Sequence, residues 1–522
     1  MAKAAVIAAA LALAIGVYGH RLRDSPPYLG LDEAHFANHA HSLATSARDL
    51  NGNLLPLFIS LEDPLGGTPS LPWGTTWYHP YGFYLIAAAL TVLPLAEWSV
   101  RLPIVLIGVL NMLLVYAIGR RWHGSSAVAA GAAALLALTP AHFILSRLAL
   151  DYLLPLPFVL GWLLAATSLW RTHSRNAAIV TGVVLGAGCF SYVSSWLLMP
   201  IYLAISGATL VSHGRRDLVA PLLLGFGVPL LALLPWVMAH PDMPANVLAQ
   251  YQAGESRTSV VTAVLTGQSV TAAMRDAVSA YWSYFDPSFL FVAGGSSRLV
   301  STGSIGVWPM GMAALLLIGT YRAIVSPTTE RVVLLAGLLL APAPAALKGE
   351  PFAIQRAVAL LPFGVLLGAD GLRAALAGSG AARPFVAVIA LSIPLQFAGF
   401  AGDYFGGYRA RAALALDPTA FPESAAVLLG EPHGDPTRMI AMASPLYDIS
   451  AKWRFFCTKA GRTDLLARTR YFSGRLQELS DLPPGSLAVV EATGATNPGG
   501  WTVVARPTAV FGEAPLTILR RH

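Results

Sequence analysis

The chain has 522 residues, of which 55% are hydrophobic and only 12% are charged. Soluble domains carry about 25% charged residues, so this composition excludes an ordinary soluble protein and predicts an all-α polytopic membrane protein. The formal net charge of +7 does not indicate nucleic-acid binding, because the arginines collect in short loops between apolar runs, where positive charge sets membrane orientation.

The predicted membrane spans follow apolar runs that are close to the about 20 residues needed to cross a bilayer. We place about eleven, with boundaries uncertain by a few residues: 4–19, 102–119, 125–146, 152–171, 176–193, 195–212, 217–239, 305–324, 331–347, 355–372 and 384–401. The stretch 81–95 is apolar as well. If it does not cross, the basic residues of the short loops fall on one face; if it crosses, every later loop flips. We therefore interpret 81–95 as a helix lying in the interface, with a cytoplasmic N-terminus.

This topology places three long polar segments on the outer face. They are the first loop 20–101, the loop 240–304 and the tail 403–522. We expect a transmembrane catalytic domain over 1–402 and a small extracytoplasmic α/β domain over 403–522. Within the tail, 419–430 is typical of a helix, and 438–443, 486–490 and 501–505 alternate like strands.

Asp32 and Glu33 stand in the first outer loop, just after the first span. A charge kept beside the bilayer is by default a functional-site candidate. The plainer interpretation is that Asp32 caps the helix predicted to follow it. The two roles are compatible, and we take Asp32 as the principal candidate.

Tyr78, His79 and Tyr81 mark the start of the interfacial helix, where Pro80 is well tolerated in the first turn. His79 would lie near backbone N–H groups that attract an anion. An exposed interfacial histidine is the competing interpretation.

Further outer-face charges could assemble a site. Arg147 and Asp151 are spaced i, i+4, which suits an ordinary ion pair or a second acid opposite Asp32. Arg101, Lys348 and Arg356 break the positive-inside trend, and such cations bind a lipid phosphate or snorkel to headgroups. In the loop 240–304, the candidate sugar contacts or interface anchors are Glu255, Arg257, Tyr281 and Tyr284. Tyr78 and Tyr81 of the first outer loop are further candidate sugar contacts. No Walker loop, Gly-x-Ser-x-Gly or zinc-ligand spacing occurs, and no metal or other cofactor is demanded.

Several short motifs occur in a familiar order: Asp32-Glu33 after the first span, His79-Pro80-Tyr81, Arg101-Leu102-Pro103, the run from Ser146 to Asp151, and the run from Tyr281 to Phe291. Together they resemble the GT-C fold glycosyltransferases, above all the protein O-mannosyltransferases and lipid A aminoarabinose transferases of glycosyltransferase family 39 and its relatives. The resemblance covers roughly 1–370.

The resemblance implies a role for each matching residue. Asp32 would be the catalytic carboxylate, Glu33 its motif partner and Asp151 a second acid, with His79 near the donor phosphate. Arg356 ranks above Arg101 and Lys348 as a phosphate ligand. Aminoarabinose transferases have a glutamate where this chain has Tyr78, which argues against aminoarabinose as the sugar.

We therefore expect a glycosyltransferase that moves a sugar from a polyprenyl-phosphate donor to an acceptor hydroxyl of a lipid, glycan or protein. The reaction would be inverting and extracytoplasmic, at a bacterial inner (plasma) membrane, with Asp32 as the base. The alternative is a transporter or flippase of lipid-linked saccharides. Transporters place ionisable or helix-breaking residues at the midplane of paired repeats, whereas these spans are nearly free of central charge and show no repeat.

Overall fold

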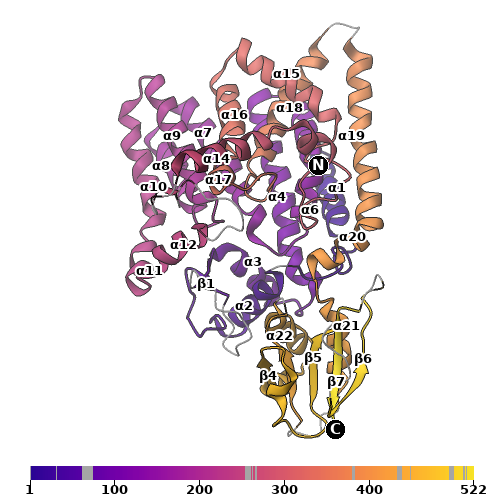
Figure 1. Cartoon of the computed structure of the whole chain (residues 1–522). Helices are drawn as coiled ribbons and strands as arrows, with labels where there is room; N and C mark the ends of the chain where they lie inside the picture. Colours follow the sequence, from indigo (N-terminus) through magenta and orange to yellow (C-terminus); the bar gives the residue numbers. More distant parts are fainter. Residues whose placement is uncertain are drawn as a thin grey trace. The chain divides into compact units, whose positions relative to one another are not determined.

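The computed structural model describes residues 2–30, 32–61, 75–252, 260, 263–264, 267, 269–378, 382–431, 438–446, 448–492, 499–509, 512 and 514–522. By its contacts the chain divides into two compact units. The larger unit contains Met1–His20, Thr76–Gly82 and Ile104–Asp403, and the smaller unit contains Arg21–Thr75, Phe83–Pro103 and Tyr404–His522. Figure 1 labels the elements of both.

The larger unit is a bundle of apolar helices, broken where proline removes a backbone donor or restricts the residue before it. Pro140, for example, begins α6, and only Leu138 and Thr139 separate it from the end of α5. The elements of this unit are α1 (Ala2–Gly19), β2 (Trp77–Tyr78), the part of α4 (Glu97–His123) from Ile104 onward, α5 (Ser126–Ala137), α6 (Pro140–Leu145), η1 (Asp151–Leu153), α7 (Pro155–Thr172), α8 (Arg175–Gly188), α9 (Ser195–Ser212), η2 (Arg216–Leu218), α10 (Val219–Leu230), α11 (Leu233–Ala239), α12 (Met243–Gln252), α14 (Val270–Ser283), η3 (Ser288–Val292), α15 (Gly311–Val325), α16 (Thr329–Leu340), α17 (Ala343–Lys348), α18 (Leu360–Ala377) and α19 (Ala382–Phe405).

Every predicted span coincides with a helix or a consecutive pair of helices, so the fold class is confirmed. Within the described part of the chain, 7 helices are long and apolar enough to cross a membrane. Shorter apolar helices cover Ala9–Gly19, Pro80–Leu90, Ser126–Ala137 and Gly311–Val325. The number that crosses stays a prediction. Helix α3 (Pro80–Leu90) has 11 residues, and its placement in the interface stays a prediction.

Glycines bring α8 and α10 into backbone contact. A Cβ atom on Gly182 would lie 2.1 Å from the carbonyl oxygen of Leu222, and one on Gly225 would lie 2.2 Å from that of Ile179. Small residues of this kind let apolar helices approach closely where no hydrophobic effect drives them together.

The smaller unit joins the loop after α1 to the tail. Its elements are α2 (Glu33–Ser46), β1 (Ile59–Ser60), most of α3, the first turns of α4, α20 (Gly407–Leu416), α21 (Phe421–Leu429), β3 (Ile440–Ala443), α22 (Ile449–Lys459), α23 (Thr463–Ala467), β4 (Thr469–Phe472), η4 (Leu476–Leu479), β5 (Leu487–Glu491), β6 (Trp501–Ala505) and β7 (Leu516–Arg521). The predicted α/β character of the tail is confirmed.

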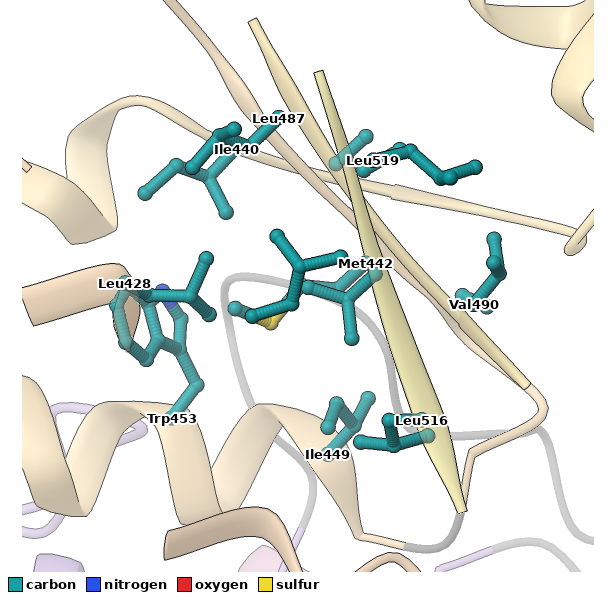
Figure 2. Close-up of a cluster of buried hydrophobic side chains, with 14 of the residues drawn as sticks. Leu428, Ile440, Met442, Ile449, Trp453, Leu487, Val490, Leu516 and Leu519 are labelled. Atoms are coloured by element: carbon teal, nitrogen blue, oxygen red, sulfur yellow. The ribbon is translucent and has the colours of Figure 1, made fainter. Parts of the chain in front are cut away.

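The tail folds around a 5-stranded sheet of order β4-β3-β5-β7-β6. Strand β3 pairs in parallel with β4 and β5, and β7 pairs antiparallel with β5 and β6. Figure 2 shows the apolar core, in which Leu428 of α21 and Trp453 of α22 lie beside Met442 of β3. All three side chains are fully buried.

Helix α2 packs against α22 of the tail. The side-chain amide of Asn38 donates to the carbonyl oxygen of Ala451 at 2.8 Å, and His35 Nε2 lies 3.5 Å from Asp448 Oδ1. The hydroxyl of Tyr28 donates to Glu423 at 2.9 Å. The predicted domain boundary between 402 and 403 rests on the change in composition. The residue contacts of the structure place the tail in one unit with the loop that precedes Asp32.

Candidate functional site

Asp32 occupies the N-cap position of α2 and is half-buried. Its carbonyl oxygen accepts from the N–H of Phe36 at 2.9 Å and so opens the helix. Its carboxylate makes no capping hydrogen bond to the helix, although Asp at this position commonly does so. The prediction that Asp32 caps this helix therefore holds for its backbone position, whereas its side chain makes no capping hydrogen bond.

Glu33 and Arg101 form a bidentate ion pair, and both side chains are fully buried. Arg101 Nε donates to Glu33 Oε1 at 3.0 Å and Nη2 donates to Oε2 at 2.9 Å. The remaining guanidinium donors reach the carbonyl oxygens of Leu22 (3.3 Å), Pro26 (2.9 Å) and Tyr28 (2.6 Å). We call this arrangement the Arg101 clamp.

The Arg101 clamp holds the turn that leads into Asp32. Glu33 Oε2 also accepts from the N–H of Gly30 at 2.9 Å. All five N–H groups of a guanidinium are thus engaged within the protein, so we leave Arg101 out of the phosphate-binding set proposed below. Glu33 is thus held between Arg101 and the backbone of Gly30.

Asp151 is the first residue of η1 and is buried. It belongs to the larger unit and Asp32 to the smaller one, so their expected proximity stays a prediction. Arg147, also buried, donates to the carbonyl oxygens of Tyr18 and His20 at the end of α1. The last carbonyl oxygens of a helix have no donor partner further along it, and a cation there also suits the helix dipole.

His79 lies immediately before α3 and is buried. Trp196 Nε1 donates to His79 Nε2 at 2.7 Å, so this ring nitrogen carries no proton. Burial lowers the pKa of His79 to about 3. The histidine is therefore neutral near pH 7 and supplies no positive charge to a phosphate.

Most of the tyrosines predicted as sugar contacts donate their hydroxyl groups to backbone carbonyl oxygens. The hydroxyl of Tyr81 donates to the carbonyl oxygen of Ala187 at 3.1 Å, and that of Tyr281 to Leu339 at 2.9 Å. Tyr284 is considered below with Glu350. Tyr78 forms the end of β2 and is half-buried. Glu255 and Arg257 lie outside the described residues.

Lys348 and Arg356 meet at one acid, Glu350, that sequence reasoning missed. Lys348 Nζ lies 2.9 Å from Glu350 Oε1, and Arg356 Nε contacts Glu350 Oε2. Burial alone would raise the pKa of Glu350, but the charges of Arg356 and Lys348 outweigh it and hold that pKa below its ordinary value. The sequence does carry a signal for Glu350, because this acid lies between two cations that break the positive-inside trend.

Among the residues that the structure describes, no group of three or more His, Cys, Asp or Glu side chains could hold a metal ion.

The architecture matches solved structures. ArnT from Cupriavidus metallidurans bound to undecaprenyl phosphate superimposes with a TM-score of 0.62, at 13% identity over 99% of this chain and 98% of that chain. ArnT from the same organism in the apo state gives 0.59, with 13% identity and the same coverage. The chain has the GT-C fold.

A family model matches part of the chain. Residues 78–238 match the family model described as dolichyl-phosphate-mannose-protein mannosyltransferase. That range includes His79, Arg101 and Asp151, and it excludes Asp32 and Glu350. No curated protein matches the chain in sequence. The resemblance to GT-C proteins like those of glycosyltransferase family 39 is thereby confirmed.

Proposed function

We propose that the protein is a membrane glycosyltransferase that transfers a sugar from a polyprenyl-phosphate donor to an acceptor hydroxyl on the extracytoplasmic face of a bacterial inner membrane. The GT-C fold and the partial family match support the enzyme class. The ArnT structure with undecaprenyl phosphate supports a lipid phosphate as the carrier. The observation that carries the proposal is the Arg101 clamp, which holds the turn beside the half-buried Asp32.

In the proposed reaction, Asp32 accepts the proton of the acceptor hydroxyl as that oxygen bonds to the anomeric carbon. The bond between this carbon and the phosphate oxygen breaks, and its electron pair leaves with the polyprenyl phosphate. The configuration at the anomeric carbon inverts. Lys348 and Arg356 neutralise the departing phosphate, which makes it a better leaving group. Asp151 is proposed as a second acid near the reacting groups.

The test uses purified protein in detergent with a labelled polyprenyl-phosphate sugar and an acceptor extract. We expect release of polyprenyl phosphate, which a flippase without transfer chemistry would not produce. Asp32→Asn should lower the rate by about 10²–10⁴-fold, the usual worth of a general base, while donor binding persists. Asp24→Asn is the matched control, since Asp24 is exposed on the same loop. A normal rate in Asp32→Asn would refute the assigned base.

A further inference from the structure

The charges between α17 and α18 form a compact triad. Side-chain exposure is 15% for Lys348, 19% for Arg356 and 34% for Glu350. Each carboxylate oxygen of Glu350 contacts a different cation. The triad carries one net positive charge and faces solvent mainly through its acid.

The backbone under this triad is held in place. Tyr284, which is fully buried, donates its hydroxyl to the carbonyl oxygen of Glu350 at 2.7 Å and accepts from the N–H of Ala353 at 3.0 Å. Gly349 ends α17 with φ 74 and ψ 21, a conformation that favours glycine. The main chain of Glu350 is thus fixed, and its side chain is the part that can move without disturbing the fold.

A carboxylate that bridges two cations through its two oxygens presents the same pattern as two oxygens of a phosphate group. Arg binds both anions in similar geometry. A phosphate ester carries up to two negative charges and more acceptor oxygens than a carboxylate. It therefore competes with Glu350 for Arg356 and Lys348, and it cannot occupy the same contacts while Glu350 remains there.

We propose that Glu350 is a resident anion, which occupies Lys348 and Arg356 until the phosphate of the polyprenyl carrier displaces it. The inference rests on the proposed function, because it names the same two cations as the phosphate ligands. A ligand that must displace an internal competitor binds with an apparent affinity reduced by the fraction of free sites. Glu350 thus weakens retention of the polyprenyl phosphate product and returns the cations to a paired state after release.

The experiment measures equilibrium binding of undecaprenyl phosphate to the full-length protein in detergent. Glu350→Gln keeps the size of the side chain and removes its charge, so we expect about tenfold tighter binding, a lower KM for the donor and stronger product inhibition. A purely structural role for Glu350 would leave binding unchanged or weaken it. Asp276→Asn is the control, because it removes one negative charge from the same outer region, where Asp276 lies 4.0 Å from Arg275. It should not change affinity.

Two further variants separate the possible failures. If the wild type does not bind undecaprenyl phosphate, or Arg356→Gln binds as well as wild type, the phosphate site of the proposed function is wrong. If the wild type binds, Arg356→Gln loses binding and Glu350→Gln binds no more tightly, only the resident anion is refuted. Glu350→Asp keeps the charge and so protects folding, but its shorter side chain cannot reach both cations from the same backbone. It should also bind more tightly, and unchanged or weaker binding contradicts the inference.

Discussion

At the residue scale, the adjacent acids Asp32 and Glu33 have different surroundings. Glu33 is fully buried against Arg101, and such a charge is tolerated inside a protein only when its partner and hydrogen bonds are in place. Asp32 is half-buried and remains within reach of solvent. The Arg101 clamp engages the carboxylate of Glu33 and the backbone before Asp32, and so fixes the position of the main chain at Asp32.

The Arg101 clamp should not tolerate lysine. Arg101→Lys keeps the charge but replaces a planar fork of five donors with a single ammonium of three, so the carbonyls of Leu22, Pro26 and Tyr28 cannot all be satisfied. We expect a loss of about 1–3 kcal/mol of stability, the cost of leaving buried acceptors unsatisfied, and a lower kcat with little change in donor KM. Thermal unfolding in detergent and donor kinetics measure both.

Arg23→Lys is the control for that substitution, because Arg23 is exposed on the same loop. If Arg101→Lys unfolds at the wild-type temperature and transfers sugar at the wild-type rate, the clamp does not position Asp32.

The residues of the candidate site could be predicted only in part from the sequence. Asp32 and Glu33 were found because charge beside a bilayer is costly, but Arg101 is 68 positions from Glu33, and no local pattern joins them. Trp196 lies 117 positions from His79 and carries no sequence signal of its own. Burial, which neutralises His79, is a property of the folded chain.

At the scale of elements, hydropathy found the helices of the bundle and alternation found three strands of the tail. Strand β4 was not predicted from the sequence, since Thr469–Phe472 is mostly half-buried at the sheet edge and lacks a clear alternation. Strand β7 was not predicted either, although Leu516–Arg521 lies between β5 and β6. Its position depends on pairing with strands far away in the sequence, which no short window contains.

The glycine contact between α8 and α10 gives an element-scale prediction. Gly182→Ala places a Cβ atom 2.1 Å from the carbonyl oxygen of Leu222, so the helices must separate and lose contact along their length. We expect a destabilisation of about 1–3 kcal/mol, typical of overpacking, seen as a lower unfolding temperature and a smaller yield of monodisperse protein. Gly227→Ala on α10 meets nothing within 4 Å and should be neutral or slightly stabilising. Equal behaviour of the two variants would contradict close packing.

At the scale of the whole molecule, segments far apart in the chain build one unit. The loop before Asp32, helix α2 and the tail are joined by Tyr28 to Glu423, Asn38 to Ala451 and Lys459 to Glu97. The tail therefore supports the loop that carries the candidate base. The sequence predicts the tail as a separate domain because its composition changes at 403. Composition does not report which surfaces are in contact, so it could not predict that the tail packs against the loop before Asp32.

The membrane topology is the whole-molecule prediction on which the outer-face site depends. Both native cysteines, Cys189 and Cys457, are buried, so single cysteines introduced at exposed positions can be labelled against a low background. We expect Asn51→Cys and Gln477→Cys to react with a membrane-impermeant maleimide in intact spheroplasts. Asn176→Cys and Ser326→Cys should react only after permeabilisation. All four positions are exposed.

Each outcome of this labelling has a defined physical meaning. The arginine-rich short loops face inward only if 81–95 stays in the interface, and one extra crossing there would reverse every later loop. Labelling of Asn176→Cys from outside, with Asn51→Cys also outside, would mean that 81–95 crosses the bilayer. Asp151 would then emerge on the side opposite Asp32, and a single extracytoplasmic site containing both acids would be impossible. Protection of Asn176→Cys keeps the two acids on one face, as the proposed reaction requires.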